Sequence, residues 1–297
     1  MAINYNNYNK INTNVRIYKV KEFILFYSVS ILWLIIPWLI KKIILKQFFV
    51  PVRYTPNKKE QEILSQGTNF KIFVDQQRIQ CWKWGSGPAV IFSHGWNGSG
   101  IQFRSFIKHL TDSGYSAILF DGPGHGLSDG EISSYFQMTN TIRALMRYCA
   151  SNETGLCGIV GHSFGAAAIV NAVNKENEQI PIVLIAPALY LKQILEKTFQ
   201  KYGIPLYIFR SVIRDFEVKY GYSLVSDNPV DLLTNHQIPA LIIHDEEDKV
   251  IPCQISKRFS TKSKLIKLLI TRRLGHSRIL KDRGVIESII GYLKQNN

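Results

Sequence analysis

A serine lies between two glycines in the pentapeptide Gly-His-Ser-Phe-Gly at residues 161–165. An apolar run, 156–160, comes before this pentapeptide, and a stretch of small residues, 166–173, follows it. That order predicts a strand, a tight turn and a helix, with glycine wherever a Cβ would collide with the neighbouring strand or helix. We therefore expect Ser163 at the tip of a sheet and at the N-terminus of a helix, where N–H groups can bind an oxyanion. The chemistry that this arrangement allows is nucleophilic catalysis by a hydroxyl group.

A serine hydroxyl needs a general base to become a nucleophile, and the expected chain order on such a sheet is serine, acid, histidine. His276 fits the base because it lies in a glycine-bearing loop near the C-terminus. Two other histidines also follow the serine. We interpret both as structural, because His236 is near the end of a helical stretch and His244 is at the end of an apolar run.

The acid is expected in the run of four carboxylates at 245–248. Asp248 is the favoured residue because it lies beyond the predicted strand, in a turn from which a carboxylate can reach back toward the histidine loop. Asp245, at the strand terminus, remains the alternative. Glu246 and Glu247 are interpreted as solvated side chains.

Two backbone N–H groups near the serine would be needed to bind a developing oxyanion. The first is predicted to be the N–H of Phe164, which follows the nucleophile, and the second the N–H of Trp96, just after the apolar run 89–92. The side chains of His94 and His125 are expected to brace their loops rather than to take part in the chemistry.

From residue 70 onward, short apolar runs alternate with amphipathic stretches, a pattern that indicates a series of β–α units. The predicted strands are an opening hairpin, 71–74 and 79–84, followed by 89–92, 117–120, 156–160, 182–185, 240–243 and 264–270. Nearly every distinctive glycine or polar cluster follows one of these runs, and ligands gather at the carboxyl ends of parallel strands. An aromatic, helical stretch, about 188–237, interrupts the alternation. It would form a lid, and plain packing of core helices explains its aromatic residues equally well.

These motifs together resemble those of the α/β-hydrolase superfamily over residues 67–295. The matching segments are His94-Gly95-Trp96, the Asp-Gly-Pro-Gly-His-Gly-Leu-Ser turn at 121–128, the pentapeptide at 161–165, Asp248 followed by Val250-Ile251-Pro252, and Gly275-His276. The set is similar to the branch of serine esterases, monoacylglycerol-lipase-like hydrolases and serine aminopeptidase-like proteins. One departure is Asp245, where many members have glycine.

The resemblance implies an α/β fold with a mostly parallel eight-stranded sheet and a small helical lid. It also implies Ser163 as nucleophile, His276 as base and Asp248 as the carboxylate that orients the base, with an acyl-enzyme intermediate. No metal and no organic cofactor is implied, since the chemistry needs only the triad and a water molecule.

The N-terminal region combines positive charge with an apolar segment. Of the net charge of +14, residues 1–60 hold +8, from ten Lys and Arg against two Glu. Nothing here resembles a zinc knuckle or an aromatic-basic RNA-binding signature, so no nucleic-acid partner is expected. Residues 23–40 are eighteen residues without a charge, about 27 Å long as a helix and close to the minimum for crossing a bilayer.

This pattern predicts an N-terminal hydrophobic helix over 23–50 that anchors the protein in a membrane, after a mobile basic tail over 1–22. A slight excess of basic residues after the apolar segment favours a cytoplasmic hydrolase domain. The alternatives are a cleaved signal peptide, a helix lying in the membrane interface and a helix packed on the core of the domain itself.

The leading functional hypothesis is a membrane-anchored serine hydrolase that cleaves carboxylic esters, with small-molecule esters, acylglycerols and other lipids as candidate substrates. A serine peptidase or an acyltransferase with the same triad is a second hypothesis. A catalytically idle hydrolase fold that serves as a membrane-tethered binding module is the third.

Overall fold

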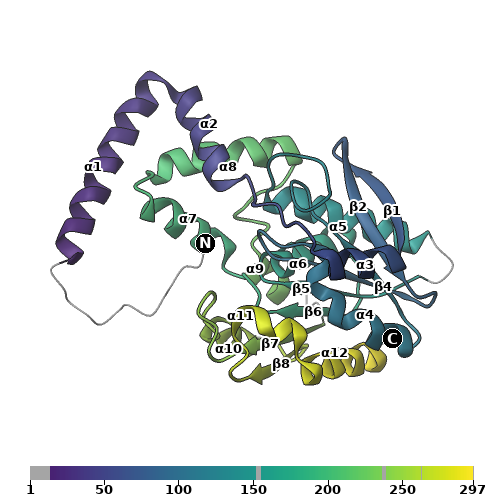
Figure 1. The fold of residues 1–297 in the computed structure, drawn as a ribbon. Helices are drawn as coiled ribbons and strands as arrows, with labels where there is room; N and C mark the ends of the chain where they lie inside the picture. Colours follow the sequence, from purple (N-terminus) through teal and green to yellow (C-terminus); the bar gives the residue numbers. More distant parts are fainter. Residues whose placement is uncertain (1–13, 152–154, 236–238, 262, 297) are drawn as a thin grey trace.

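The computed structural model describes residues 14–151, 155–235, 239–261 and 263–296 (Figure 1). Its centre is an eight-stranded sheet with the strand order β1-β2-β4-β3-β5-β6-β7-β8. The strands are β1 (Thr68–Val74), β2 (Gln77–Trp84), β3 (Ala89–Ser93), β4 (Ser116–Phe120), β5 (Leu156–His162), β6 (Ile182–Ile185), β7 (Ala240–Asp245) and β8 (Ile266–Thr271). Each of the eight apolar runs predicted to be a strand overlaps one of them.

The expectation of a mostly parallel sheet is corrected, because the sheet is mixed. Strand β2 runs antiparallel to both of its neighbours, β1 and β4, whereas the strands from β4 to β8 pair in parallel. The reason lies in the turn between β1 and β2, where Asp75 and Gln76 have φ of 49° and 64°. Two consecutive residues with positive φ form the tight turn that reverses the chain into an antiparallel hairpin.

Helices cover both faces of the sheet (Figure 1). They are α1 (Asn14–Ile35), α2 (Pro37–Phe48), α3 (Lys58–Gln66), α4 (Arg104–Asp112), α5 (Tyr135–Ala150), α6 (Phe164–Glu176), α7 (Leu191–Lys201), α8 (Leu206–Tyr220), α9 (Pro229–Asn235), α10 (Gln254–Ser260), α11 (Gly275–Arg278) and α12 (Arg283–Gln295). Successive side chains of a strand point to opposite faces. Accordingly, Ile91 of β3 packs in one core cluster with Ile142 of α5, and Phe92 packs in another with Phe106 of α4 and Val285 of α12.

The N-terminal apolar segment does not form the expected single membrane helix. Helix α1 ends at Ile35 and α2 begins at Pro37, because Pro37 has no N–H to continue the hydrogen-bond ladder. In the part of the chain that the structure describes, no helix has the length and apolar character needed to cross a membrane. The prediction of a membrane-anchored protein is therefore wrong, and the cytoplasmic placement derived from it loses its basis. Of the predicted mobile tail, residues 1–13 lie outside the described residues.

The physical reason for this correction is that part of the segment is buried in the protein. Ile40 and Ile44 of α2 and Phe49 just after it have exposed fractions of 7%, 2% and 6%. All three belong to the same core cluster as α5, α6 and the helices between β6 and β7. The alternative of a helix packed on the domain's own core thus describes α2. Hydrophobicity alone did not distinguish a side chain covered by protein from one covered by lipid.

Helices α7, α8 and α9 lie between β6 and β7, where the sequence predicts a helical lid over about 188–237. Their aromatic side chains are partly core residues, and Phe199, Phe209 and Phe216 are all buried. Figure 1 shows α1 and α2 on the same side of the molecule as α7 and α8. The last residues of the predicted lid, 236–237, lie outside the described residues, as does His236.

Candidate active site

The turn that carries Ser163 joins β5 to α6 with the geometry that the pentapeptide predicts. Ser163 has φ 54° and ψ −116°, a strained conformation for a residue with a side chain. A Cβ on Gly161 would lie 2.8 Å from the Cα of Ala166, and one on Gly165 would lie 2.4 Å from the carbonyl oxygen of His94. Both positions therefore need glycine for the close approach of neighbouring backbone.

His276 and Asp248 come together although 28 residues separate them in the sequence. The Nδ1 atom of His276, in α11, lies 2.7 Å from Oδ2 of Asp248. The other carboxylate oxygen, Oδ1, accepts hydrogen bonds from the N–H groups of Val250 and Ile251 at 2.7 and 2.9 Å. The Asp248 side chain is fully buried.

The protonation of Asp248 follows from these contacts. Burial by itself raises the pKa of the carboxyl group, but hydrogen bonds from His244 and His276 outweigh it and hold the pKa well below its usual range. An ionised carboxylate is an acceptor only, so Nδ1 of His276 must be the donor. This tautomer leaves Nε2 of His276 able to accept a proton.

Asp245, the alternative acid, is engaged differently. Its Oδ1 accepts from the N–H of Glu247 at 3.0 Å, and its Oδ2 accepts from the hydroxyl of Thr271 at 2.9 Å and the N–H of Leu274 at 3.0 Å. Burial raises the pKa of Asp245, yet these hydrogen bonds and others from the backbone lower it overall. Asp245 thus ties the end of β7 to the loop that carries His276.

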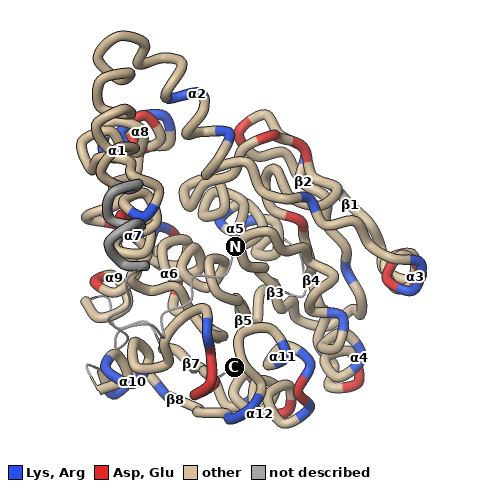
Figure 2. The backbone as a smooth tube through the Cα atoms, turned by 60° about the vertical axis from the view of Figure 1, so that its left-hand side comes forward, with Lys and Arg blue, Asp and Glu red and all other residues tan. Residues whose placement is uncertain are grey.

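Glu246 lies at the surface in a mixed patch of charges. Its two carboxylate oxygens pair with Nζ of Lys257 at 2.8 Å and Nε of Arg272 at 3.0 Å. Figure 2 shows this acidic loop after β7 beside basic residues of neighbouring elements. Glu246 was interpreted as a solvated side chain, and the structure adds that it pairs with two cations.

Two histidines other than the predicted base touch the site. His244 is fully buried, with Nε2 3.3 Å from Oδ2 of Asp248 and 3.0 Å from the carbonyl of Ile251, and with Nδ1 2.7 Å from the hydroxyl of Ser256. It was interpreted as a structural residue at a strand end. Its position four residues before the expected acid was the available signal.

His162 lies directly before the serine and contacts the base. Its Nε2 is 2.9 Å from the carbonyl oxygen of His276, and the two ring centroids are 4.6 Å apart. Burial, and next the charge of the nearby His276, lower the pKa of His162 to about 3. A neutral His162 can donate its Nε2–H to that carbonyl, and so it fixes the base loop to the serine turn.

The two predicted oxyanion donors lie on segments that meet beside the serine. The rings of Trp96 and Phe164 contact edge to face, with centroids 5.4 Å apart. A Cβ built on Gly95 would lie 3.2 Å from the Cβ of Ser163. The loop after β3 therefore passes against the serine turn, and the N–H groups of Trp96 and Phe164 remain the predicted donors.

His94 connects the loop after β3 to the loop after β4. Its Nε2 accepts a hydrogen bond from the N–H of Gly122 at 2.8 Å, and its Nδ1 lies 2.8 Å from the carbonyl of Gly95. The His125 ring lies edge to face against Trp96, with centroids 5.4 Å apart. Neither histidine needs a chemical role to explain these contacts. Within the described ranges, no cluster of His, Cys, Asp and Glu could hold a metal ion.

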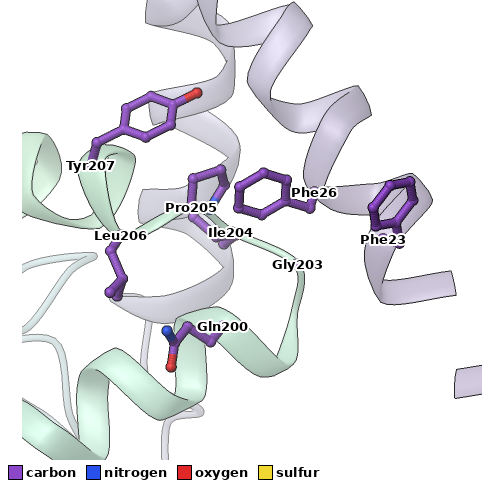
Figure 3. A pocket seen from close by; sticks show the side chains of 8 residues that line it. All are labelled: Phe23, Phe26, Gln200, Gly203, Ile204, Pro205, Leu206 and Tyr207. Atoms are coloured by element: carbon purple, nitrogen blue, oxygen red, sulfur yellow. The ribbon is translucent and has the colours of Figure 1, made fainter. Parts of the chain in front are cut away.

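An apolar hollow of about 560 Å³ lies apart from these residues, between α1 and the connection from α7 to α8 (Figure 3). Its lining residues are Phe23, Phe26, Gln200, Gly203, Ile204, Pro205, Leu206 and Tyr207. In Figure 3, the ring of Phe26 points toward Pro205 and Ile204. None of the predicted site residues lines this hollow.

One family model and several curated proteins match parts of this chain. The family model for serine aminopeptidase, S33, matches residues 87–232. The uncharacterized protein YqkD of Bacillus subtilis is 25% identical over 195 residues, which cover 63% of this chain and 63% of YqkD. The chain thus spans less than two thirds of that relative's length.

Solved structures show the same fold. The esterase Pf2001 of Pyrococcus furiosus superimposes with a TM-score of 0.65 at 19% identity, covering 84% of this chain and 97% of the esterase. Est1E of Butyrivibrio proteoclasticus, solved with ferulic acid bound, gives a TM-score of 0.61 at 20% identity, with 76% and 96% covered. The chain thus has the fold of these esterases, and the family-model match over residues 87–232 supports a member of the α/β-hydrolase superfamily.

Proposed function

We propose that the protein is a serine hydrolase that cleaves carboxylic esters through an acyl-enzyme. Ser163 is the nucleophile, His276 the general base and Asp248 the residue that orients it. The observation that carries the proposal is the 2.7 Å contact between His276 Nδ1 and the buried Asp248 carboxylate, in a fold whose β5 ends at a strained serine. The names of the esterases that share the fold support ester substrates.

The reaction begins when Nε2 of His276 removes the proton from the Ser163 hydroxyl and the oxygen attacks the ester carbonyl carbon. The N–H groups of Trp96 and Phe164 stabilise the negative oxygen of the tetrahedral intermediate. Asp248 stabilises the imidazolium that forms. His276 then protonates the leaving alcohol, and the acyl group stays on the Ser163 oxygen. A water molecule, deprotonated by His276, attacks this acyl-enzyme, and His276 returns the proton to the Ser163 oxygen as the acid leaves.

In this proposal the hydrolase domain spans residues 67–295, and the helices within about 188–237 cover the site as a lid. Small-molecule esters and lipid esters both fit a triad at the end of a sheet. A panel of nitrophenyl esters of increasing acyl length distinguishes them. Aminoacyl nitroanilides in the same panel test the peptidase alternative, since the matched family model is that of a serine aminopeptidase.

The test is labelling by a fluorophosphonate probe and ester turnover in Ser163→Ala. We expect labelling to disappear and turnover to fall by about three orders of magnitude or more, because the remaining groups supply only binding and oxyanion stabilisation. The matched control is Ser134→Ala, since Ser134 also lies at a helix N-terminus, where its hydroxyl oxygen accepts from the N–H of Gln137. The control variant should keep full labelling.

Two outcomes would contradict the proposal. Labelling that persists in folded Ser163→Ala would put the nucleophile elsewhere in the chain. A folded wild-type protein that neither reacts with the probe nor turns over any ester of the panel would favour the idle binding module.

A further inference from the structure

The segment that connects α2 to α3 lies along the loops that follow β3 and β4. The carbonyl of Phe49 accepts a hydrogen bond from the N–H of Ser133 at 2.7 Å. Pro51 lies so close to Gly124 that a Cβ on the glycine would be 3.2 Å from the proline Cγ. The N–H of Val52 donates to Oδ1 of Asn97 at 2.8 Å. Residues 49–53, which we call the N-terminal strap, therefore contact both loops.

Arg53, the last residue of the strap, makes several hydrogen bonds to one loop. Its Nη1 donates to the carbonyl oxygens of Gly126, Ser128 and His125 at 2.8, 2.7 and 3.4 Å, and its Nη2 donates to that of Gly130 at 2.5 Å. These carbonyls lie 72 to 77 residues away in the sequence. Only a planar guanidinium with donors on both Nη atoms can bind such a set, and a lysine has neither the shape nor the spread of donors.

The loop that Arg53 holds supports, in turn, the loop of the predicted oxyanion donor. Oδ1 of Asp121 accepts hydrogen bonds from the hydroxyl of Ser99 at 2.6 Å and from the N–H of Gly100 at 2.9 Å. At the other end of the same loop, the ring of His125 packs against Trp96. The loops after β3 and β4 are thus joined at Trp96 itself and again at Ser99 and Gly100.

The strap also contacts the residue next to Trp96 directly. Asn97 has φ 57°, a left-handed conformation that few residues other than glycine, asparagine and aspartate adopt readily. The hydrogen bond from the Val52 N–H holds the Asn97 side chain and so restrains this backbone conformation. Asn97 directly follows Trp96, so the strap is bound next to the residue whose N–H is the predicted oxyanion donor.

We propose that the N-terminal strap positions the oxyanion site, with Arg53 and Asn97 as positioning residues that act through the Trp96 loop. This inference rests on the proposed function and extends it to a segment far from the triad in sequence. The beginning of the strap is attached to the helices between β6 and β7, because Phe49 stacks on Phe216 of α8 with ring centroids 4.7 Å apart. The strap therefore connects these helices to the oxyanion loop.

The test compares Arg53→Met with Arg53→Lys and a control. Methionine keeps most of the side-chain length and removes every donor, whereas lysine keeps the charge and one donor group. We expect kcat for a nitrophenyl ester to fall about tenfold in Arg53→Met, with KM nearly unchanged, because the substrate still binds while the oxyanion donor is displaced. Arg53→Lys should recover part of the loss.

The rate constant for fluorophosphonate labelling gives a readout specific to the oxyanion site, because its tetrahedral adduct places an oxygen there. It should fall in parallel with kcat. The control is Arg78→Met, since Arg78 pairs at 2.9 Å with the side chain of Asp129 in the same loop, without contacting the carbonyls that Arg53 binds. Its kcat and labelling rate should stay within about twofold of the wild type.

Asn97→Gly provides a second route if Arg53→Met does not fold. Glycine accepts φ 57° without strain and removes the side chain whose oxygen binds the N–H of Val52. The proposal is overturned if folded Arg53→Met, or folded Asn97→Gly, is labelled at the wild-type rate, or if Arg53→Met and Arg78→Met lose activity equally. Wild-type protein that is not labelled at all would refute the proposed function itself, which is a distinct result.

Discussion

Lowering the pH from 7 to 5 should destabilise the folded protein by about 4 kcal/mol through two buried histidines, His125 and His162. Burial is the main cause of the low pKa of each, about 3, and a neighbouring histidine adds to it, His94 beside His125 and His276 beside His162. In the unfolded chain each ring regains its ordinary pKa of about 6.5. The unfolded state therefore binds more protons than the folded state between about pH 6.5 and pH 3.

The sign and the size of the effect follow from that difference. Above about pH 6.5 the two buried, neutral histidines do not reduce the free energy of unfolding. As the pH falls from about 6.5 toward 3, the free energy of unfolding decreases. At pH 5, 1.5 units below the ordinary pKa, each histidine costs about 2 kcal/mol at 1.36 kcal/mol per unit. Two such residues give about 4 kcal/mol. Asp245 and Asp248 have a lowered pKa, and their contribution to the free energy of unfolding is lost only below about pH 4. The change between pH 7 and pH 5 therefore reports the histidines and not these carboxylates.

The measurement is urea unfolding at pH 7 and pH 5, followed by tryptophan fluorescence. His162→Asn should lose about 2 kcal/mol less than the wild type between these two pH values, and His125→Asn should behave likewise. His109→Gln, in α4, serves as a control for removing a partly exposed histidine and should keep the wild-type difference. A wild-type loss below about 1 kcal/mol, or an unchanged loss in both asparagine variants, would refute the reasoning.

Two further paired substitutions test the site and its scaffold. Asp248→Asn should lower kcat/KM for a nitrophenyl ester by roughly three to four orders of magnitude, because it no longer selects the productive tautomer of His276, and Asp245→Asn should cost much less. If Asp245→Asn lowered kcat/KM more than Asp248→Asn did, at equal thermal stability of the two variants, Asp245 and not Asp248 would be the acid. Gly165→Ala should destabilise by about 2 kcal/mol or more in urea unfolding, because its Cβ would lie 2.4 Å from a carbonyl oxygen. Gly291→Ala in α12, where a Cβ meets nothing within 4 Å, should be neutral or stabilise by up to about 1 kcal/mol, and equal destabilisation of both would contradict the steric argument.

The sheet was predictable because buried strands leave a local signal. The run 182–185 matches β6 at both ends, and the run 89–92 misses only the last residue of β3. These strands are covered on both faces, so their sequences are continuous apolar runs. The hairpin of β1 and β2 was predicted, but the antiparallel pairing of β2 with β4 was not, because it joins residues 33 to 39 positions apart in the sequence.

The part of the N-terminal segment from Ile40 to Phe49 was misjudged because its partners are distant in sequence. Nothing near Ile44 indicates that it is covered by protein, and nothing near Arg53 indicates that its donors meet carbonyls more than seventy residues away. The same holds for His162, whose contact with His276 joins residues 114 positions apart in the sequence. Local patterns predict which elements form, and long-range contacts determine what a given side chain faces.

The serine turn shows how the two kinds of information combine. The pentapeptide predicts the strained conformation of Ser163, which costs on the order of 1–3 kcal/mol. The surrounding fold offsets that cost, since the N–H of Ser163 donates to the carbonyl of Ile185 at 2.9 Å and its carbonyl accepts from the N–H of Ala188 at 3.1 Å. Both partners belong to the end of β6 and the chain just after it. A Gly-x-Ser-x-Gly sequence without such a neighbouring strand would relax, so the motif indicates a nucleophile only within a sheet that holds it.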